Sequence, residues 1–136
     1  MDAKEYLSQA FILDRRIKAK ERQLDVLKEH VPYTTPVFGD VKVLSSQSTS
    51  CVEKSALRIV ALSDEIQRDI ARLDDIMKAI RQVISRVENN DMECVLQMRY
   101  LSFMSWCEIT KCLGYSEGHV FRLHRLALKK VNGIIS

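Results

Sequence analysis

The feature that most constrains this chain is an unbroken heptad repeat that begins at Val52 and ends at Val87. Apolar or small residues recur there in alternating steps of four and three, which is the spacing of a helix that buries one narrow seam. The repeat predicts a helix over 52–88 that is about 50 Å long, too long for one face of a compact domain. The predicted seam consists of Val52, Ala56, Ile59, Ser63, Ile66, Ile70, Leu73, Met77, Ile80, Ile84 and Val87.

A second repeat predicts a helix over 3–31, which Pro32 ends because proline cannot continue a helix. Two helices with narrow seams fold most simply into an antiparallel hairpin, and a second copy can pack alongside. Lys20 and Ser63 are polar residues inside the seams, and such residues often fix register and partner number. We therefore expect a homo-oligomer, dimeric or higher; the alternative is a monomer in which the seams cover each other. The first seam consists of Ala3, Tyr6, Ala10, Leu13, Ile17, Lys20, Leu24, Leu27 and Val31.

The segment 32–51 contains both prolines of the chain and ends in a serine-rich stretch. A connection of about 20 residues is unusually long for a compact domain, so we interpret it as a linker. Its alternating stretch VFGDVKVL, at 37–44, is a candidate strand, and Ser50 or Ser55 can cap the next helix.

Three shorter helices are predicted near 91–101, 105–113 and 116–132. The sequence VENND supplies a break and an N-cap for the first of them. Ser105 and Glu108 are spaced as a capping box for the second, and Ser116 can cap the third. Gly114 stands where a helix ends on a left-handed residue. A short helix, a glycine turn and a second helix together predict a helix-turn-helix. Gly114 and Ala127 are small residues, which we interpret as places where helices cross closely.

The last predicted helix has an apolar stripe and an opposite face that carries most of the positive charge. Its inward stripe consists of Val120, Leu123, Ala127 and Val131. Residues 98–136 carry six Lys and Arg against two Asp and Glu, whereas the whole chain has a net charge of only +3. Arginine can bind guanine or phosphate, and a helix N-terminus donates to phosphate, so the unit suits the major groove of DNA. The predicted outward face also includes His124, and the candidate DNA-binding residues are Ser116, Glu117, Gly118, His119, Phe121, Arg122, Arg125, Lys129 and Lys130.

The stretch YLSFMSWCEITKCLGYSEGHVFRLHRLALKKV, at 100–131, resembles region four of bacterial sigma factors. Together with MDAKEYLSQAFILDRRI at its start, the whole chain is similar to a family of small phage and prophage proteins that stands near the ArpU and RinA late-gene regulators. The resemblance implies base-reading positions at Glu117, Gly118, Phe121 and Arg122. Of these, Arg122 alone keeps an obvious polar reading role, so the target should differ from a usual minus-35 promoter element. Gly118 could admit the backbone close to DNA, and Phe121 could touch a thymine methyl group.

We therefore expect an all-α protein with two domains. Residues 1–90 would form the helical hairpin and oligomerisation arm, and residues 91–136 the sigma region four-like helix-turn-helix domain. The expected function is that of a sequence-specific transcription regulator that activates phage late genes. Its expected partner is double-stranded DNA, with bacterial RNA polymerase as a second partner to consider. Two alternatives are a small-terminase-like packaging protein and a region four mimic that binds polymerase without reading DNA.

Other function classes find no support in the residues. No nucleophile, phosphate loop or carboxylate pair has a catalytic pattern, so we expect no enzyme and no cofactor. The four cysteines lack the spacing of a metal site, and we expect reduced, mostly buried thiols and no metal. The chain contains no apolar run of the roughly 20 residues that a membrane span requires, and no signal-peptide pattern. A cytoplasmic protein of the host bacterial cell, without membrane contact, is the expectation.

Overall fold

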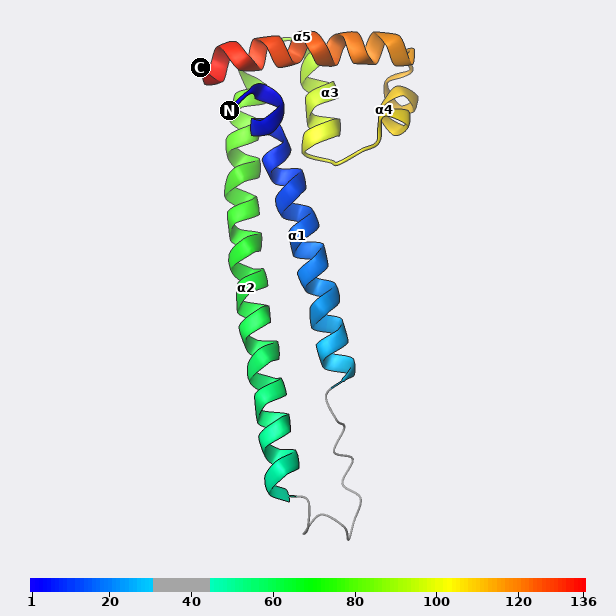
Figure 1. Cartoon of the computed structure of the whole chain (residues 1–136). Coiled ribbons are helices and arrows are strands. Elements are labelled where there is room, and N and C mark those ends of the chain that lie inside the picture. The colour runs from blue at the N-terminus through cyan, green and yellow to red at the C-terminus, as the bar shows by residue number, and fades with distance from the viewer. Residues whose placement is uncertain (31–44) are drawn as a thin grey trace. The chain divides into compact units, whose positions relative to one another are not determined.

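The computed structural model describes residues 1–30 and 45–136, and every regular element in these ranges is a helix. The prediction of an all-α chain is confirmed for them. The candidate strand at 37–44 lies outside the described residues. In chain order the helices are α1 (Ala3–Glu29), α2 (Ser45–Ser85), α3 (Asn90–Tyr100), α4 (Trp106–Leu113) and α5 (Glu117–Ile135), as Figure 1 shows.

The predicted helix boundaries hold to within about three residues at every end except one. Helix α2 begins at Ser45, whereas its heptads predicted a start at residue 52. The reason is that Ser, Thr and Gln each cost only roughly 0.7 kcal/mol or less in a helix relative to Ala. A serine-rich stretch therefore does not stop a helix that its C-terminal neighbours already stabilise, and the predicted linker over 32–51 extends too far.

The chain forms two compact units, which we call the first and the second unit. The first unit consists of Met1–Arg15 and Arg72–Ser136, and the second of Arg16–Ala71. Helices α1 and α2 each contribute to both. The boundaries of these units therefore differ from those of the expected domains, 1–90 and 91–136. The last three helices belong to the same unit as the start of α1 and the end of α2.

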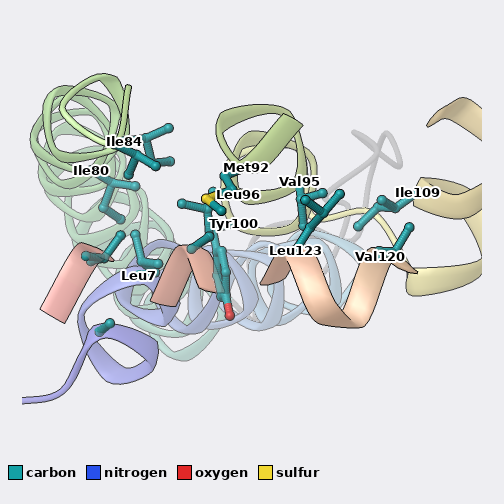
Figure 2. Packing of buried hydrophobic residues seen from close by; sticks show 14 of the residues in the cluster. Leu7, Ile80, Ile84, Met92, Val95, Leu96, Tyr100, Ile109, Val120 and Leu123 are labelled. Carbon is teal, nitrogen blue, oxygen red and sulfur yellow. The ribbon is translucent and has the colours of Figure 1, made fainter. Parts of the chain in front are cut away.

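The core of the first unit is built from all five helices around one face of α5. Figure 2 shows Leu7, Ile80 and Ile84 together at one end, and Val95, Ile109, Val120 and Leu123 together at the other, with Leu96 and Tyr100 between them. Leu7 is fully buried, although the heptad pattern did not include it. Full burial of a Val, Leu or Ile side chain contributes about 1.5–3 kcal/mol, so this set supplies much of the stability of the unit.

The first turn of α1 is tied to α5 by a hydrogen bond. The backbone N–H of Ala3 donates to Oδ1 of Asn132 at 2.7 Å. An N–H in the first turn of a helix has no partner within that helix, so this contact satisfies a donor that otherwise needs water. Together with buried Leu7, it fixes the beginning of the chain within the core of the last three helices.

The second unit contains a buried ion pair that the heptad pattern did not predict. Lys20 Nζ lies 2.6 Å from Asp69 Oδ2 and 3.6 Å from Glu65 Oε1. Asp69 is only 7% exposed, whereas Ile70, predicted to lie in the seam, is 41% exposed. The placement of Ile70 in the seam is therefore wrong. The Lys20 ammonium needs a carboxylate opposite it, because an unpaired buried charge is costly. Asp69 therefore faces inward, and its neighbour Ile70 faces solvent as a consequence.

We predict that Lys20→Met lowers the free energy of unfolding by roughly 2–3 kcal/mol, because the buried carboxylate of Asp69 then loses its hydrogen bond and ion pair with Lys20. The double variant Lys20→Met with Asp69→Leu should recover most of this loss, since apolar pairs of similar volume replace buried ion pairs well. Urea unfolding followed by circular dichroism measures both.

Lys78→Met is the matched control, because Lys78 and Asp74 form an exposed pair with side chains 64% and 63% accessible. It should leave the free energy of unfolding nearly unchanged, because solvent screens an exposed pair. Equal losses for Lys20→Met and Lys78→Met would contradict a structural role for the buried pair.

Candidate nucleic-acid interface

Helices α4 and α5 are joined by a tight turn in which each helix end is capped. Ser105 Oγ accepts from Glu108 N at 3.2 Å, and Glu108 Oε2 accepts from Ser105 N at 3.2 Å, so the predicted capping box is confirmed. Ser116 Oγ accepts from His119 N at 3.2 Å, which confirms the predicted cap of α5. These contacts satisfy amide donors at both helix starts and so fix where α5 begins.

Gly114 ends α4 in the left-handed conformation, with φ +69°, as the sequence predicted. Its N–H donates to the carbonyl of Thr110 at 2.9 Å. A Cβ added at Gly114 would meet no atom within 4 Å, so the interpretation that helices cross closely at this residue is wrong. The glycine is required by its positive φ, which costs a residue with a side chain about 1 kcal/mol or more.

One face of α5 is buried and the opposite face is cationic. Val120, Leu123, Ala127 and Val131 are buried, as predicted. Steps of four, three and four residues place a second stripe on one face of a helix, and this stripe lies opposite the buried one. All its members are exposed, and no carboxylate in the described part of the chain pairs with its three cations. The cationic stripe consists of Gly118, Arg122, Arg125 and Lys129.

The two flanks of this stripe make contacts with the rest of the first unit. Phe121 packs edge-on against Trp106, with ring centroids 5.1 Å apart, and still exposes 42% of its surface. On the other flank, the exposed His119 ring lies 4.8 Å from the ring of Tyr115, whose hydroxyl donates to Asp91 Oδ1 at 3.2 Å. Both side chains are thus held by neighbours on one side while they remain accessible to a partner on the other.

Lys130 lies on the same flank of α5 as His119 and is directed to the end of α2. Its Nζ donates to the carbonyl of Val87 at 3.4 Å. The remaining candidates, Ser116, Glu117 and Gly118, are exposed at the N-terminus of α5. A Cβ added at Gly118 would meet no atom of the protein within 4 Å, so the protein's own packing does not require glycine there.

His124 is not on the outward face, which corrects the sequence-based expectation. It is half-buried, and its ring lies 4.7 Å from that of Trp106 and 5.7 Å from that of Tyr100. Burial, followed by the nearby charges of Arg99 and Lys4, lowers the pKa of His124 to about 4. Burial likewise raises the pKa of Tyr100 to about 12. The Tyr100 hydroxyl and Nε2 of a neutral imidazole therefore share a hydrogen bond of 2.6 Å.

The cysteines are less buried than expected. Cys51, Cys107 and Cys112 are exposed and Cys94 is half-buried, and all four are free thiols. The expectation of mostly buried thiols is therefore wrong. Each lies on a helix surface outside the core stripes, so none contributes to the central packing.

Among the described residues, no group of three or more His, Cys, Asp or Glu side chains has the arrangement of a metal site. Within the same residues, no helix combines the length and the apolar character needed to cross a bilayer.

These features define an all-helical protein whose last two helices are joined by a capped glycine turn and whose last helix exposes a cationic stripe. The chain belongs to the family described as "Protein of unknown function (DUF1492)", which matches residues 34–132. No curated protein and no solved structure matches the chain.

The low pKa of His124 predicts an acid-sensitive stability. The unfolded histidine binds a proton near pH 6.5, whereas the folded one does so only near pH 4. The stabilisation by neutral His124 is thus present above pH 6.5 and is lost as the pH falls toward 4. The loss is about 2–3 kcal/mol, less than the full shift would give, because solvent screens the half-buried ring. His124→Gln keeps an acceptor for Tyr100 but does not titrate. As the pH falls from 6.5 to 4, the free energy of unfolding should therefore fall more for the wild type than for His124→Gln. Parallel curves of unfolding free energy against pH for the two proteins would contradict the low pKa of His124.

Proposed function

We propose that this protein is a sequence-specific DNA-binding transcription regulator. In this proposal α4, the Gly114 turn and α5 form a helix-turn-helix of the sigma region four type, with α5 as the helix that enters the major groove. The resemblance of residues 100–131 to region four, and of the whole chain to the small phage proteins near the ArpU and RinA regulators, supports a role as an activator of phage late genes.

The observation that carries the proposal is the cationic stripe of α5. A helix that buries one face and exposes three unpaired cations on the opposite face offers charge to phosphates without first breaking ion pairs of its own. Gly118 and Arg122 lie in the first two turns of α5, the part of a recognition helix that reaches base edges, whereas Lys129 lies two turns further along. Arg122 is therefore assigned to base reading and Lys129 to the phosphate backbone.

The flanks refine this assignment. Phe121 is exposed enough to meet a thymine methyl group, while its contact with Trp106 limits how far its ring can move. His119 and Ser116 lie at the N-terminus of α5, where amide donors and the helix dipole favour an approaching phosphate. Lys130 already donates to Val87, so we assign it a smaller share of the phosphate contacts than Lys129.

We also propose that the long helices form a hairpin through which the protein associates with itself. The support lies in the second unit, where Leu57 is 69%, Val60 56% and Val26 49% exposed. Leu57 and Val60 are three residues apart and so share one face of α2. Neighbouring apolar residues on a narrow helix are typical of a surface that a further helix covers.

We predict that Arg122→Ala weakens binding to the preferred duplex by about 1–3 kcal/mol and relaxes the preference at one base pair. Lys129→Ala should instead weaken binding to all duplexes alike and lower the salt slope by about one. The preferred duplex comes from selection in a random library, and fluorescence anisotropy at several salt concentrations gives the affinities. Lys28→Ala, which removes an exposed lysine at the end of α1, is the control and should change neither.

Two results of this experiment would contradict the proposal. Equal losses on preferred and random duplexes for Arg122→Ala would mean that this residue positions the protein and does not read sequence. An absence of binding by the wild type at low salt would favour the alternative in which the protein mimics region four and binds RNA polymerase alone.

For self-association, we predict that Leu57→Glu with Val60→Glu raises the dissociation constant of the oligomer at least about tenfold, because carboxylates would replace apolar contacts between copies. Sedimentation equilibrium measures the constant, and circular dichroism should be unchanged, since both residues are exposed in one chain. Gln82→Glu with Gln97→Glu adds the same charge at other exposed positions and should leave the constant unchanged. A wild-type monomer would contradict the proposed arm, and a ring of many copies would favour the small-terminase alternative.

A further inference from the structure

The first unit contains a small cavity of about 130 Å³ beside the Trp106 cluster. Its walls come from the start of α1, the end of α3, the loop that follows α3, the first residue of α4 and the middle of α5. Aromatic rings form most of the wall: Phe11, Tyr100, Phe103, Trp106 and His124. Of these rings, that of Trp106 also packs against Phe121, one of the candidate DNA-binding side chains.

The polar groups at this cavity are cationic or neutral. Lys4, Arg99 and Ser8 line it, and no Asp or Glu does. No carboxylate in the described residues pairs with Lys4. The Arg99 guanidinium lies 4.6 Å from the centre of the Trp106 ring and donates through one nitrogen to the carbonyl of Met104 at 3.0 Å. A guanidinium has five N–H donors, so Arg99 is held in place and keeps donors for a further acceptor.

The loop after α3 lines the cavity and contains a residue in a strained backbone conformation. Phe103 has φ +57°, a left-handed conformation that costs a bulky residue about 1 kcal/mol or more. Its ring packs against that of Phe11 at 5.8 Å, and Phe11 in turn lies 5.5 Å from the guanidinium carbon of Arg15. Such strain persists where surrounding contacts fix it, and it concentrates at binding sites.

The size of the cavity limits what can enter. A buried apolar cavity of about 150 Å³ is known to accommodate benzene, so a volume of about 130 Å³ suits one six-membered ring. A planar ring can stack against the aromatic wall, and an anionic group on that ring would lie between the two cations. An uncharged ring would make no use of the charges of Lys4 and Arg99, and a small anion without a ring would leave the apolar wall uncovered.

We infer that this cavity is a binding site for a small aromatic carboxylate, a single ring that bears one anionic group. The ring lies against Trp106 and Phe103, and the carboxylate accepts hydrogen bonds from Arg99 and from Lys4 at the mouth. This site adjoins the proposed DNA-binding face through the contact of Trp106 with Phe121, and its occupancy is measured in the absence of DNA.

Benzoate is the probe, and the full-length protein is titrated with it. Trp106 is the one tryptophan of the chain, so its fluorescence reports the cavity directly, and isothermal titration calorimetry gives an independent affinity. We expect saturable binding of benzoate that is at least about tenfold tighter than that of benzyl alcohol, which has the ring but no charge. Acetate, which has the charge but no ring, should bind as weakly as benzyl alcohol.

Two variants and one control make the test specific. Lys4→Met should weaken benzoate about three- to tenfold and leave benzyl alcohol unchanged, because it removes a partly solvated charge at the mouth. Ser8→Phe should abolish binding of both, because its ring fills the cavity. Lys111→Met, which removes an exposed lysine of α4 that does not line the cavity, should change nothing. No saturable signal with benzoate, equal affinities for the three probes, or equal effects of Lys4→Met and Lys111→Met would each overturn the inference.

Discussion

The burial of one face of α5 is the constraint on which the rest of the first unit depends. Val120 and Leu123 pack with α3 and α4, and the end of the same helix receives the first turn of α1 through the bond from Ala3 to Asn132. Arg122, Arg125 and Lys129 lie on the face opposite the buried stripe, and all three are exposed. The same packing holds Trp106 between Arg99, Phe121 and His124, so the aromatic cluster is a consequence of how α5 is seated. The proposed function rests on this division of α5 into a buried and a cationic face.

Local rules were sufficient for both ends of α4, for the start of α5 and for the buried face of α5. The capping box at Ser105, the left-handed Gly114 and the cap at Ser116 each depend on residues within one turn of the chain, and all three are present. The apolar stripe of α5 followed from helical spacing alone. The candidate DNA-binding residues were found in the same way, since all are exposed or partly exposed on α5 or its cap. Their role remains a prediction.

Contacts between distant parts of the chain were not predictable from spacing. A strict heptad put Ile70 in the seam, but the demand of Lys20 for a carboxylate selected Asp69, which no local pattern of α2 indicates. His124 is separated from Tyr100 by 24 positions, so its inward orientation depends on where α3 ends. Leu7 is buried because the start of α1 joins the core of the later helices, a contact between opposite ends of the sequence. One sequence signal was available for the ion pair: a lone lysine in an apolar seam calls for an acidic residue on the partner helix.

The most direct test of the central claim follows the backbone amide signals of isotope-labelled protein by NMR during titration with the selected duplex. We predict that the largest shifts fall on α5 at Gly118, Arg122 and Arg125, together with the turn before it. The buried stripe and the helices of the second unit should shift little. Shifts centred on α3 or on the second unit, with α5 unaffected, would contradict the claim that the cationic face of α5 is the DNA-binding surface.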